Sequence, residues 1–200
     1  MVKDIYPGTS SYSDDVYTYG PYPNASQPTQ LTAVDGTLFF VAQDEEHGAE
    51  LWKSDGTAAG TALVADIAPG DSNSLSEKSA LANANGVLLF VANDGVHGEE
   101  LWRSDGTAVG TTLVKDITPG SGGNFADYGG PDFTVVDGTL FFSANDGTHG
   151  RELWKSDGTS AGTIMVKDIS PGTEFYGTAN SSYPFYLHDV DGKPCPARRR

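Results

Sequence analysis

The sequence predicts an all-β repeat protein in which four-stranded antiparallel units pack face to face, as the blades of a β-propeller do. The first observation is a 40-residue unit that occurs three times without gaps, at residues 31–70, 81–120 and 133–172. The second is that each unit holds four short strand patterns, and the third is that no segment shows helical periodicity. A repeat period of about 50 residues is typical of architectures whose units cover their apolar faces by stacking.

Turn residues divide each unit into strands. Asp35-Gly36 predicts a two-residue hairpin turn, since both residues tolerate the positive φ angles that such turns require. The same signal recurs at Asn85-Gly86 and Asp137-Gly138. β-branched and aromatic residues dominate the segments between the turns. In the first unit, the predicted strands are residues 31–34, 37–42, 50–53 and 61–67.

The second strand of each unit is apolar on both faces. Residues 38–42 read Leu-Phe-Phe-Val-Ala without alternation, and residues 87–92 and 140–144 have the same character. A strand that is apolar on both sides is expected to be buried on both sides. We therefore expect each four-stranded sheet to lie between two similar sheets, which is the arrangement of propeller blades.

The segments outside the three units resemble parts of further units. Residues 1–8 match a fourth strand without its blade, and residues 187–192 match a first strand and its turn. Residues 193–200 form a non-repeat tail, in which Pro194 and Pro196 are expected to exclude an inner strand. The sequence therefore predicts three complete blades plus partial ends. This is an incomplete or open propeller: either a fragment, or a subunit whose exposed ends invite self-association.

The composition is that of an acidic protein with little cysteine. The net charge of −15 excludes the basic face that nucleic acids require, and it disfavours docking on anionic lipid. Cys195 is the single cysteine, so neither an intramolecular disulfide nor a multi-cysteine metal site can form. No apolar run approaches the roughly 20 residues of a membrane-spanning helix. We expect no nucleic-acid partner and no membrane insertion.

A repeated loop combines carboxylate and imidazole side chains. In the first unit Asp44, His47 and Glu50 lie within seven residues, and side chains of these types bind divalent metals. A histidine and a glutamate three residues apart on a strand point to opposite faces, however. The alternative is therefore a hydrogen-bonded histidine that packs on the next sheet. The equivalent residues are Asp94, His97 and Glu100 in the second unit and Asp146, His149 and Glu152 in the third.

Two further repeated features are expected to build the scaffold. Each unit has a tryptophan in its third strand, where a large aromatic side chain buries much area between sheets; a platform for sugars is the alternative. Ser-Asp-Gly-Thr then begins the next turn, in which Asp and Ser side chains accept hydrogen bonds from backbone amides. The tryptophans are Trp52, Trp102 and Trp154, and the aspartates are Asp55, Asp105 and Asp157.

Another aspartate recurs just before the Ile-x-Pro-Gly sequence, at Asp66, Asp116 and Asp168. We expect it to cap the following turn, and a role as cation ligand is the alternative. The chain is expected to need no cofactor, with Ca²⁺ bound by Asp-rich turns as the alternative.

The connectors between units carry the residues that differ. They cover residues 9–30, 71–80, 121–132 and 173–186, and three of them contain aromatic residues among Ser, Asn, Gly and Pro. The predicted topology places them on the same face as the His loops. Function usually lies on variable loops over a rigid scaffold, and this composition suits recognition loops. The alternative is packed surface loops. The candidate ligand-binding residues are Tyr17, Tyr19, Tyr22, Tyr128, Tyr176, Tyr183, His47, His97 and His149.

The repeated unit resembles a known family. Residues 50–61 read ELWKSDGTAAGT, residues 100–111 ELWRSDGTAVGT and residues 152–163 ELWKSDGTSAGT, and each is followed by a segment such as VKDITPG. This pattern is similar to the bacterial ELWxxDGT repeat family and, more loosely, to kelch propellers. The resemblance implies large secreted or surface-attached bacterial proteins with tandem repeats. It implies no established activity and no catalytic residues.

The functional expectation is a non-catalytic binding or structural scaffold of a secreted or cell-surface protein, with a glycan or a protein as ligand. None of the three His loops shows a nucleophile beside a base, a phosphate-binding glycine loop or a zinc-protease signature. Identical copies of a motif also argue against an active site, so we expect no enzyme. Two alternatives stay open. One is an extracellular hydrolase or lyase acting on polysaccharide or peptide, and the other is a Ca²⁺-stabilised assembly module.

Overall fold

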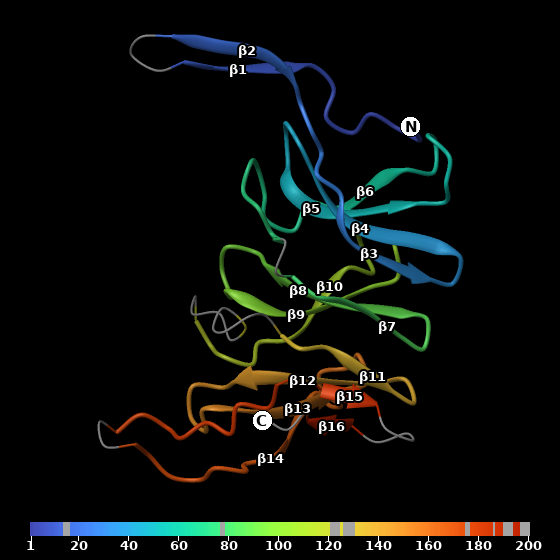
Figure 1. Cartoon of the computed structure of the whole chain (residues 1–200). Helices are drawn as coiled ribbons and strands as arrows, with labels where there is room; N and C mark the ends of the chain where they lie inside the picture. Colours follow the sequence, from blue (N-terminus) through green and yellow to red (C-terminus); the bar gives the residue numbers. More distant parts are fainter. Residues whose placement is uncertain are drawn as a thin grey trace.

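The chain folds into a stack of antiparallel β-sheets in the computed structural model (Figure 1). The structure describes residues 1–13, 17–76, 79–120, 125, 131–174, 177–185, 187–189 and 194–196. Three sheets have four strands each, and two have two strands. Among the described residues there is no helix long and apolar enough to cross a membrane. The prediction of an all-β protein with three four-stranded antiparallel units is confirmed.

Each four-stranded sheet orders its strands as they follow in the chain. Sheet 1 contains β3 (Thr29–Val34), β4 (Thr37–Asp44), β5 (Gly48–Ser54) and β6 (Ala62–Ala65). Sheet 2 contains β7 (Leu81–Ala84), β8 (Val87–Asn93), β9 (Glu99–Ser104) and β10 (Thr112–Lys115). Sheet 3 contains β11 (Thr134–Val136), β12 (Thr139–Asn145), β13 (Arg151–Ser156) and β14 (Ile164–Lys167).

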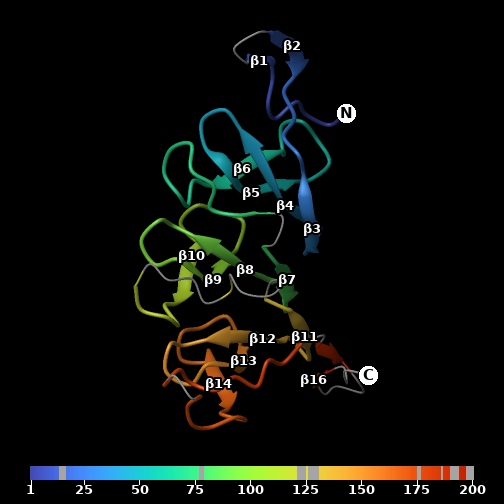
Figure 2. The ribbon, with the colours of Figure 1, turned by 60° about the vertical axis from the view of Figure 1, so that its left-hand side comes forward.

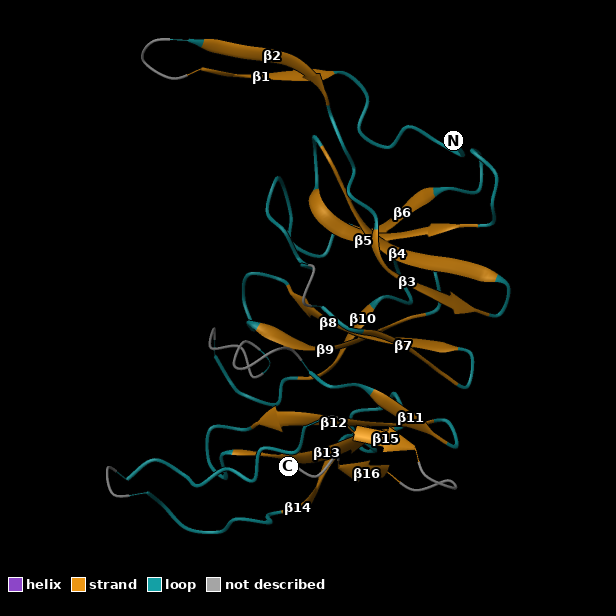
Figure 3. Ribbon diagram, in the orientation of Figure 1, coloured by secondary structure: helices purple, strands orange, loops and turns teal. Residues whose placement is uncertain are grey.

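The first hairpin of each sheet has the predicted tight turn. Asp35 and Gly36 have φ angles of 45° and 81°, and they separate the paired residues Val34 and Thr37. Asn85-Gly86 and Asp137-Gly138 behave alike. The glycine also lets the turns nest, because a Cβ on Gly86 would lie 2.5 Å from a carboxylate oxygen of Asp35 in the preceding sheet. These turns lie on the right of Figure 3.

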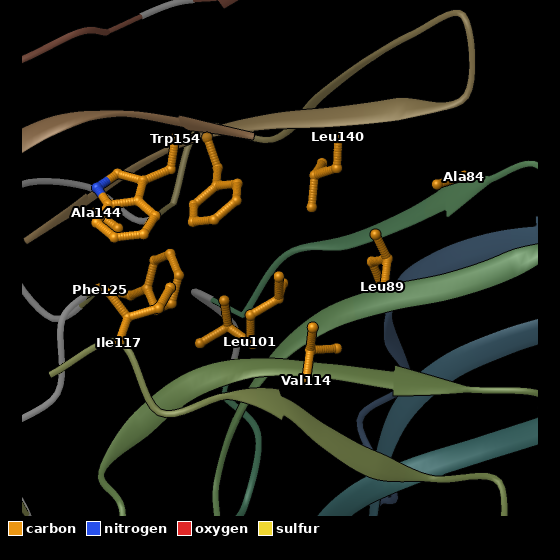
Figure 4. Close-up of a cluster of buried hydrophobic side chains, with 11 residues drawn as sticks. Ala84, Leu89, Leu101, Val114, Ile117, Phe125, Leu140, Ala144 and Trp154 are labelled. Carbon is orange, nitrogen blue, oxygen red and sulfur yellow. The ribbon is translucent and has the colours of Figure 1, made fainter. Parts of the chain in front are cut away.

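Apolar side chains fill the spaces between the sheets. The second strands are buried on both faces as predicted: Phe39 and Val41 face sheet 2, whereas Phe40 and Ala42 lie in a separate cluster on the other face. Between sheets 2 and 3, Ile117 and Leu101 lie opposite Trp154 and Leu140 (Figure 4). The stack is also visible in the rotated view of Figure 2.

Residues 1–8 differ from the prediction, since they form no β-strand. No described strand pairs with them, so they lack a ladder of backbone hydrogen bonds. Their side chains nevertheless make contacts on sheet 1. Ile5 packs against Phe40, Ala42 and Trp52, and Lys3 Nζ donates to the carbonyl of Thr61 at 2.8 Å.

The second partial end contains a short hairpin that the sequence did not predict. β15 (Leu187–Asp189) pairs with β16 (Pro194–Pro196) in a two-stranded sheet. Both strands of such a sheet are edges, so the expectation that Pro194 and Pro196 exclude an inner strand is not contradicted. In an antiparallel pair, alternate residues exchange no hydrogen bonds with the partner. The register places Pro196 opposite Leu187 and Pro194 opposite Asp189, two positions apart on each strand, so both prolines can occupy positions at which no donor to β15 is needed. The turn residues 190–192 lie outside the described residues.

The first connector contains an element that the sequence did not predict. β1 (Thr9–Ser13) and β2 (Thr18–Pro23) form an antiparallel hairpin, called here the tyrosine arm. It projects from the end of the stack next to sheet 1 (Figure 1). Every residue of both strands is exposed, so the arm owes little of its order to burial.

Candidate functional site

Each His loop forms a closed Asp–His pair. Asp94 Oδ1 accepts hydrogen bonds from the backbone amides of Val96 and His97, at 2.9 and 2.8 Å. Asp94 Oδ2 lies 2.7 Å from His97 Nδ1. The equivalent Oδ2–Nδ1 distances are 2.9 Å for Asp44–His47 and 2.7 Å for Asp146–His149. The aspartate therefore closes the turn and orients the imidazole.

The hydrogen bond shifts the pKa values of both partners. It raises the pKa of each histidine, against a smaller opposing effect of burial. Burial is the largest single influence on each aspartate and would raise its pKa. The hydrogen bonds from the histidine side chain and from backbone amides together outweigh burial and lower that pKa. Each pair is thus held as an ion pair at mildly acidic pH.

The structure does not bring the glutamates to these pairs. Glu50 is fully buried, and its carboxylate accepts hydrogen bonds from the amides of Ile67 and Ala68 and from Ser74 Oγ. Glu100 and Glu152 are buried in the same way. No group of three His, Cys, Asp or Glu side chains among the described residues could hold a metal. The suggested Asp–His–Glu metal set is therefore not assembled.

The His-Gly-x-Glu sequence instead fastens the connectors that follow sheets 1 and 3. Gly48 has a φ of 65°, and a Cβ there would lie 2.6 Å from the carbonyl oxygen of Ser72. Ala49 N donates to Asn73 Oδ1 at 2.7 Å, and Glu50 binds Ser74. Sequence reasoning missed this role. The one available signal was a glycine at a fixed position before a strand, which often marks a close backbone approach.

The Ser-Asp-Gly-Thr turns contain the hydrogen bonds that the turn interpretation expects. Asp55 Oδ1 accepts from the amide and the hydroxyl of Thr57, at 2.9 and 2.7 Å. Ser54 Oγ accepts from Gly56 N and contacts Thr61 Oγ1, which itself donates to the carbonyl of Thr57. The turns at Asp105 and Asp157 repeat this network. These side chains are engaged within the turn.

Trp102 and Trp154 lie between sheets, and Trp52 lies on the face of sheet 1 that Ile5 covers, so none of the three is on an open surface. Trp52 and Trp154 are buried and Trp102 is half-buried. The Nε1 atoms of all three are buried without a hydrogen-bond partner, as are Oδ1 of Asp116 and Oδ1 of Asp168. The cap predicted for these aspartates is therefore not made by Oδ1, and no tryptophan is an exposed platform for a sugar.

The tyrosine arm presents the most accessible aromatic surface of the described chain. Tyr12 and Tyr19 are opposite each other in the hairpin, with ring centroids 6.3 Å apart and an interplanar angle of 24°. Tyr17 lies beside Tyr19 at the same centroid distance. Neither strand contains a charged residue. The exposed fractions are 67% for Tyr12, 64% for Tyr17, 43% for Tyr19 and 59% for Tyr22.

The base of the arm is fixed to the stack. Asn24 donates from its backbone amide to the carbonyl of Gly8 and from Nδ2 to the carbonyl of Pro7, both at 3.1 Å. Gln43 on β4 donates to the carbonyls of Ser26 and Ala25. The arm is therefore held at one place although its strands are exposed. Tyr12 belongs to this surface and was not among the predicted ligand-binding residues.

The other predicted tyrosines do not join this surface. Tyr183 stacks on Phe185, with centroids 5.9 Å apart, in the connector that follows sheet 3. That connector lies at the opposite end of the stack from the arm (Figure 1). Tyr128 and Tyr176 lie outside the described residues. The structure thus groups Tyr17 and Tyr19 with Tyr12, and it separates them from Tyr183.

Comparison with known proteins assigns the chain to no family. No protein-family model and no curated protein matches the chain.

Proposed function

We propose that the chain is a non-catalytic binding module in which the tyrosine arm binds a neutral glycan and the sheet stack serves as its scaffold. The observation that carries the proposal is the cluster of Tyr12, Tyr17 and Tyr19 on an exposed hairpin whose two strands contain no charged residue. The sequence between the strands contains Asp14 and Asp15, which would repel an anionic sugar, so a neutral glycan is the proposed ligand. Aromatic side chains are seldom left exposed as a group without an interaction to make.

The chemistry of the arm favours a glycan over a protein. Its strands contain tyrosine, serine, threonine, glycine and proline only. Tyrosine combines a flat apolar ring with a polar tip, and hydroxyl groups beside it both donate and accept hydrogen bonds. This combination matches the apolar faces and hydroxyl groups of a sugar. Protein interfaces are enriched in arginine and methionine as well as aromatic residues, and the arm has neither.

The scaffold is proposed to be a propeller-type repeat of the ELWxxDGT kind. Three sheets with the same strand order, stacked through their apolar faces, are what consecutive blades require. The resemblance of the repeat sequence further supports a secreted or cell-surface bacterial protein. An exposed glycan-binding arm on an acidic scaffold suits that location.

Binding to an array of neutral oligosaccharides tests the proposed function. We expect the wild-type chain to bind a subset, and the variant carrying Tyr12→Ser, Tyr17→Ser and Tyr19→Ser to lose at least tenfold in affinity. The melting temperature should stay unchanged, because these side chains are exposed. Tyr183→Ser is the matched control, since Tyr183 is also exposed and stacked but lies at the other end of the stack.

Three results would contradict the proposal. They are absence of binding to every glycan, equal binding by the arm variant, and loss of binding in the Tyr183→Ser control. Arm-dependent binding to proteins in place of glycans would keep the site and overturn the ligand class.

A further inference from the structure

The contact between neighbouring sheets is made twice by equivalent residues. Ile67 after sheet 1 packs with Phe90, Ala92 and Trp102 of sheet 2. Ile117 after sheet 2 packs in the same cluster as Phe142, Ala144 and Trp154 of sheet 3. In each case a segment of sequence Val-x-Asp-Ile-x-Pro-Gly packs on one face of the following sheet. This face, formed by a phenylalanine, an alanine and a tryptophan, is called here the Phe–Ala–Trp face.

The Phe–Ala–Trp face of sheet 1 is occupied by residues 2–8 of the same chain. Ile5 packs against Phe40, Ala42 and Trp52. Ile117 packs in the same way on the equivalent residues of sheet 3. Lys3 Nζ donates to the carbonyl of Thr61 at 2.8 Å, and Lys115 Nζ donates to the equivalent carbonyl of Thr163 at 2.8 Å. Residues 2–8 therefore reproduce the contacts of a preceding unit without forming its sheet.

The last segment of this type has no such partner among the described residues. Residues 166–172 read VKDISPG and residues 2–8 read VKDIYPG, so six of seven positions are identical. Val64 and Val114 are 5% and 6% exposed, whereas Val166 is 46% exposed. Ile67 and Ile117 are 8% and 5% exposed, whereas Ile169 is 54% exposed. On the outer surface of sheet 3, Val166 and Ile169 are thus exposed, whereas the equivalent side chains that follow sheets 1 and 2 are buried.

We propose that residues 166–172 dock on the Phe40–Trp52 face of a second copy of this chain, and that residues 2–8 compete for that face within each copy. The second copy is the fitting partner because its face already holds the same sequence. The contact joins different surfaces of the two copies, so it is head-to-tail. Binding within one chain has the advantage of a high effective concentration, which keeps the face closed.

A second contact also opposes association. Thr134 Oγ1 donates to the carbonyl of Leu187 at 2.7 Å, just as Thr32 Oγ1 reaches the carbonyl of Leu81 at 3.5 Å. β15 therefore lies beside sheet 3 where the first strand of a following sheet would lie. A docking copy must displace β15 as well as its own residues 2–8. The two segments together act as caps against head-to-tail growth.

The test opens both caps in the full chain with Ile5→Asp and Leu187→Asp. Ile5 and Leu187 are replaced because both are cap residues that pack on the stack. In sedimentation velocity we expect the wild type to stay at 21.0 kDa and the double variant to reach at least twice that mass as concentration rises. Adding Ile169→Asp should restore the single-chain mass. Adding Val109→Asp should not, since Val109 is 92% exposed on a turn of sheet 2.

A peptide of residues 164–172 provides a second measurement on the single Ile5→Asp variant. Its fluorescence anisotropy should rise with the variant and not with the wild type, and a peptide carrying Ile169→Asp should bind at least tenfold more weakly. The proposal is overturned if the folded double variant stays at single-chain mass, if the Ile169→Asp addition leaves association unchanged, or if the variant does not bind the peptide.

Discussion

Gly56 and Gly106 show at the scale of single residues how a neighbouring sheet constrains a turn. The two glycines occupy equivalent positions and have φ angles of 90° and 87°. A Cβ on Gly106 would lie 3.2 Å from the ring of Phe39 in the preceding sheet, whereas a Cβ on Gly56 meets nothing within 4 Å. An alanine would therefore cause similar backbone strain at both positions, but only at position 106 would its Cβ crowd Phe39.

We predict that Gly106→Ala destabilises the protein more than Gly56→Ala. Both changes carry the strain of positive φ, of order 1–3 kcal/mol. Gly106→Ala adds the cost of overpacking against Phe39, about 1–3 kcal/mol. The measurement is the urea midpoint of unfolding for each variant. Equal midpoints would mean that the turn of sheet 2 does not pack against sheet 1 as the structure shows.

The Asp–His pairs give a prediction about titration. The raised histidine pKa adds stability at pH values below the ordinary 6.5, and this contribution is lost as pH rises through the raised value. The lowered aspartate pKa adds stability above the ordinary 3.8, and this is lost as pH falls through the lowered value. The pair therefore contributes most between about pH 4 and 6.5.

Asp94→Asn should lower the titration midpoint of His97 measured by NMR. The asparagine oxygen can still accept the backbone amides of Val96 and His97, so the turn should persist. His47 and His149 belong to other loops and serve as internal controls. A His97 midpoint that does not move would show that Asp94 is not the group that raises the His97 pKa.

The sequence pattern predicted the backbone conformation and the burial of some residues, but not of all. The positive φ angles at Asp35 and Asn85 follow from the Asp-Gly and Asn-Gly sequences. The burial of Phe39 and Phe40 on opposite faces follows from a strand that is apolar throughout. Glu50 could not be predicted as buried, because its partners are backbone amides of Ile67 and Ala68 that only the fold brings near.

At the scale of elements, Glu50 ties the end of one strand to the start of the next connector. Its carboxylate accepts hydrogen bonds from the backbone amides of Ile67 and Ala68 and from the hydroxyl of Ser74. This explains why β6 ends at Ala65 and not at Ile67 as predicted: the chain after Ala65 turns toward Glu50 and leaves the ladder. Burial raises the pKa of Glu50 to about 7, although these three hydrogen bonds oppose the shift.

The raised pKa of Glu50 predicts a loss of stability as pH rises. The stabilising contribution of the neutral acid is complete below its ordinary pKa of 4.5 and disappears as pH passes about 7. The upper limit of this change is about 3.5 kcal/mol, because the pKa rises from 4.5 to about 7 and each pKa unit corresponds to about 1.4 kcal/mol. Glu50→Gln should flatten the free energy of unfolding in that pH range. An unchanged pH profile in the variant would exclude Glu50 as the source.

The connectors were the least predictable elements. Turn and strand patterns sufficed for the three sheets because hydrophobic residues and glycines recur at fixed spacing. The strands β1 and β2 have no buried face, since all residues of both strands are exposed, so no alternation of apolar and polar residues signalled them. The pairing of β16 was missed because two prolines argue against an inner strand, whereas β16 is the edge of a two-stranded sheet.

At the scale of the whole molecule, the repeated residues and the variable residues have different tasks. The tryptophans, the buried glutamates and the Asp-Gly-Thr turns fix the sheets and their connectors, and the copies do so in equivalent ways. The tyrosine arm occurs once and contributes no buried side chain. We therefore attribute stability to the stack, and recognition by the arm is the proposed function.

NMR titration of the isotope-labelled full chain with a neutral oligosaccharide tests this division most directly. We predict that chemical-shift changes concentrate on β1, β2 and residue 17, with Tyr12 and Tyr19 among the most affected. Amides of the buried strand β8 should not shift. Shift changes centred on the His loops or on the connector around Tyr183, with the arm unaffected, would contradict the account.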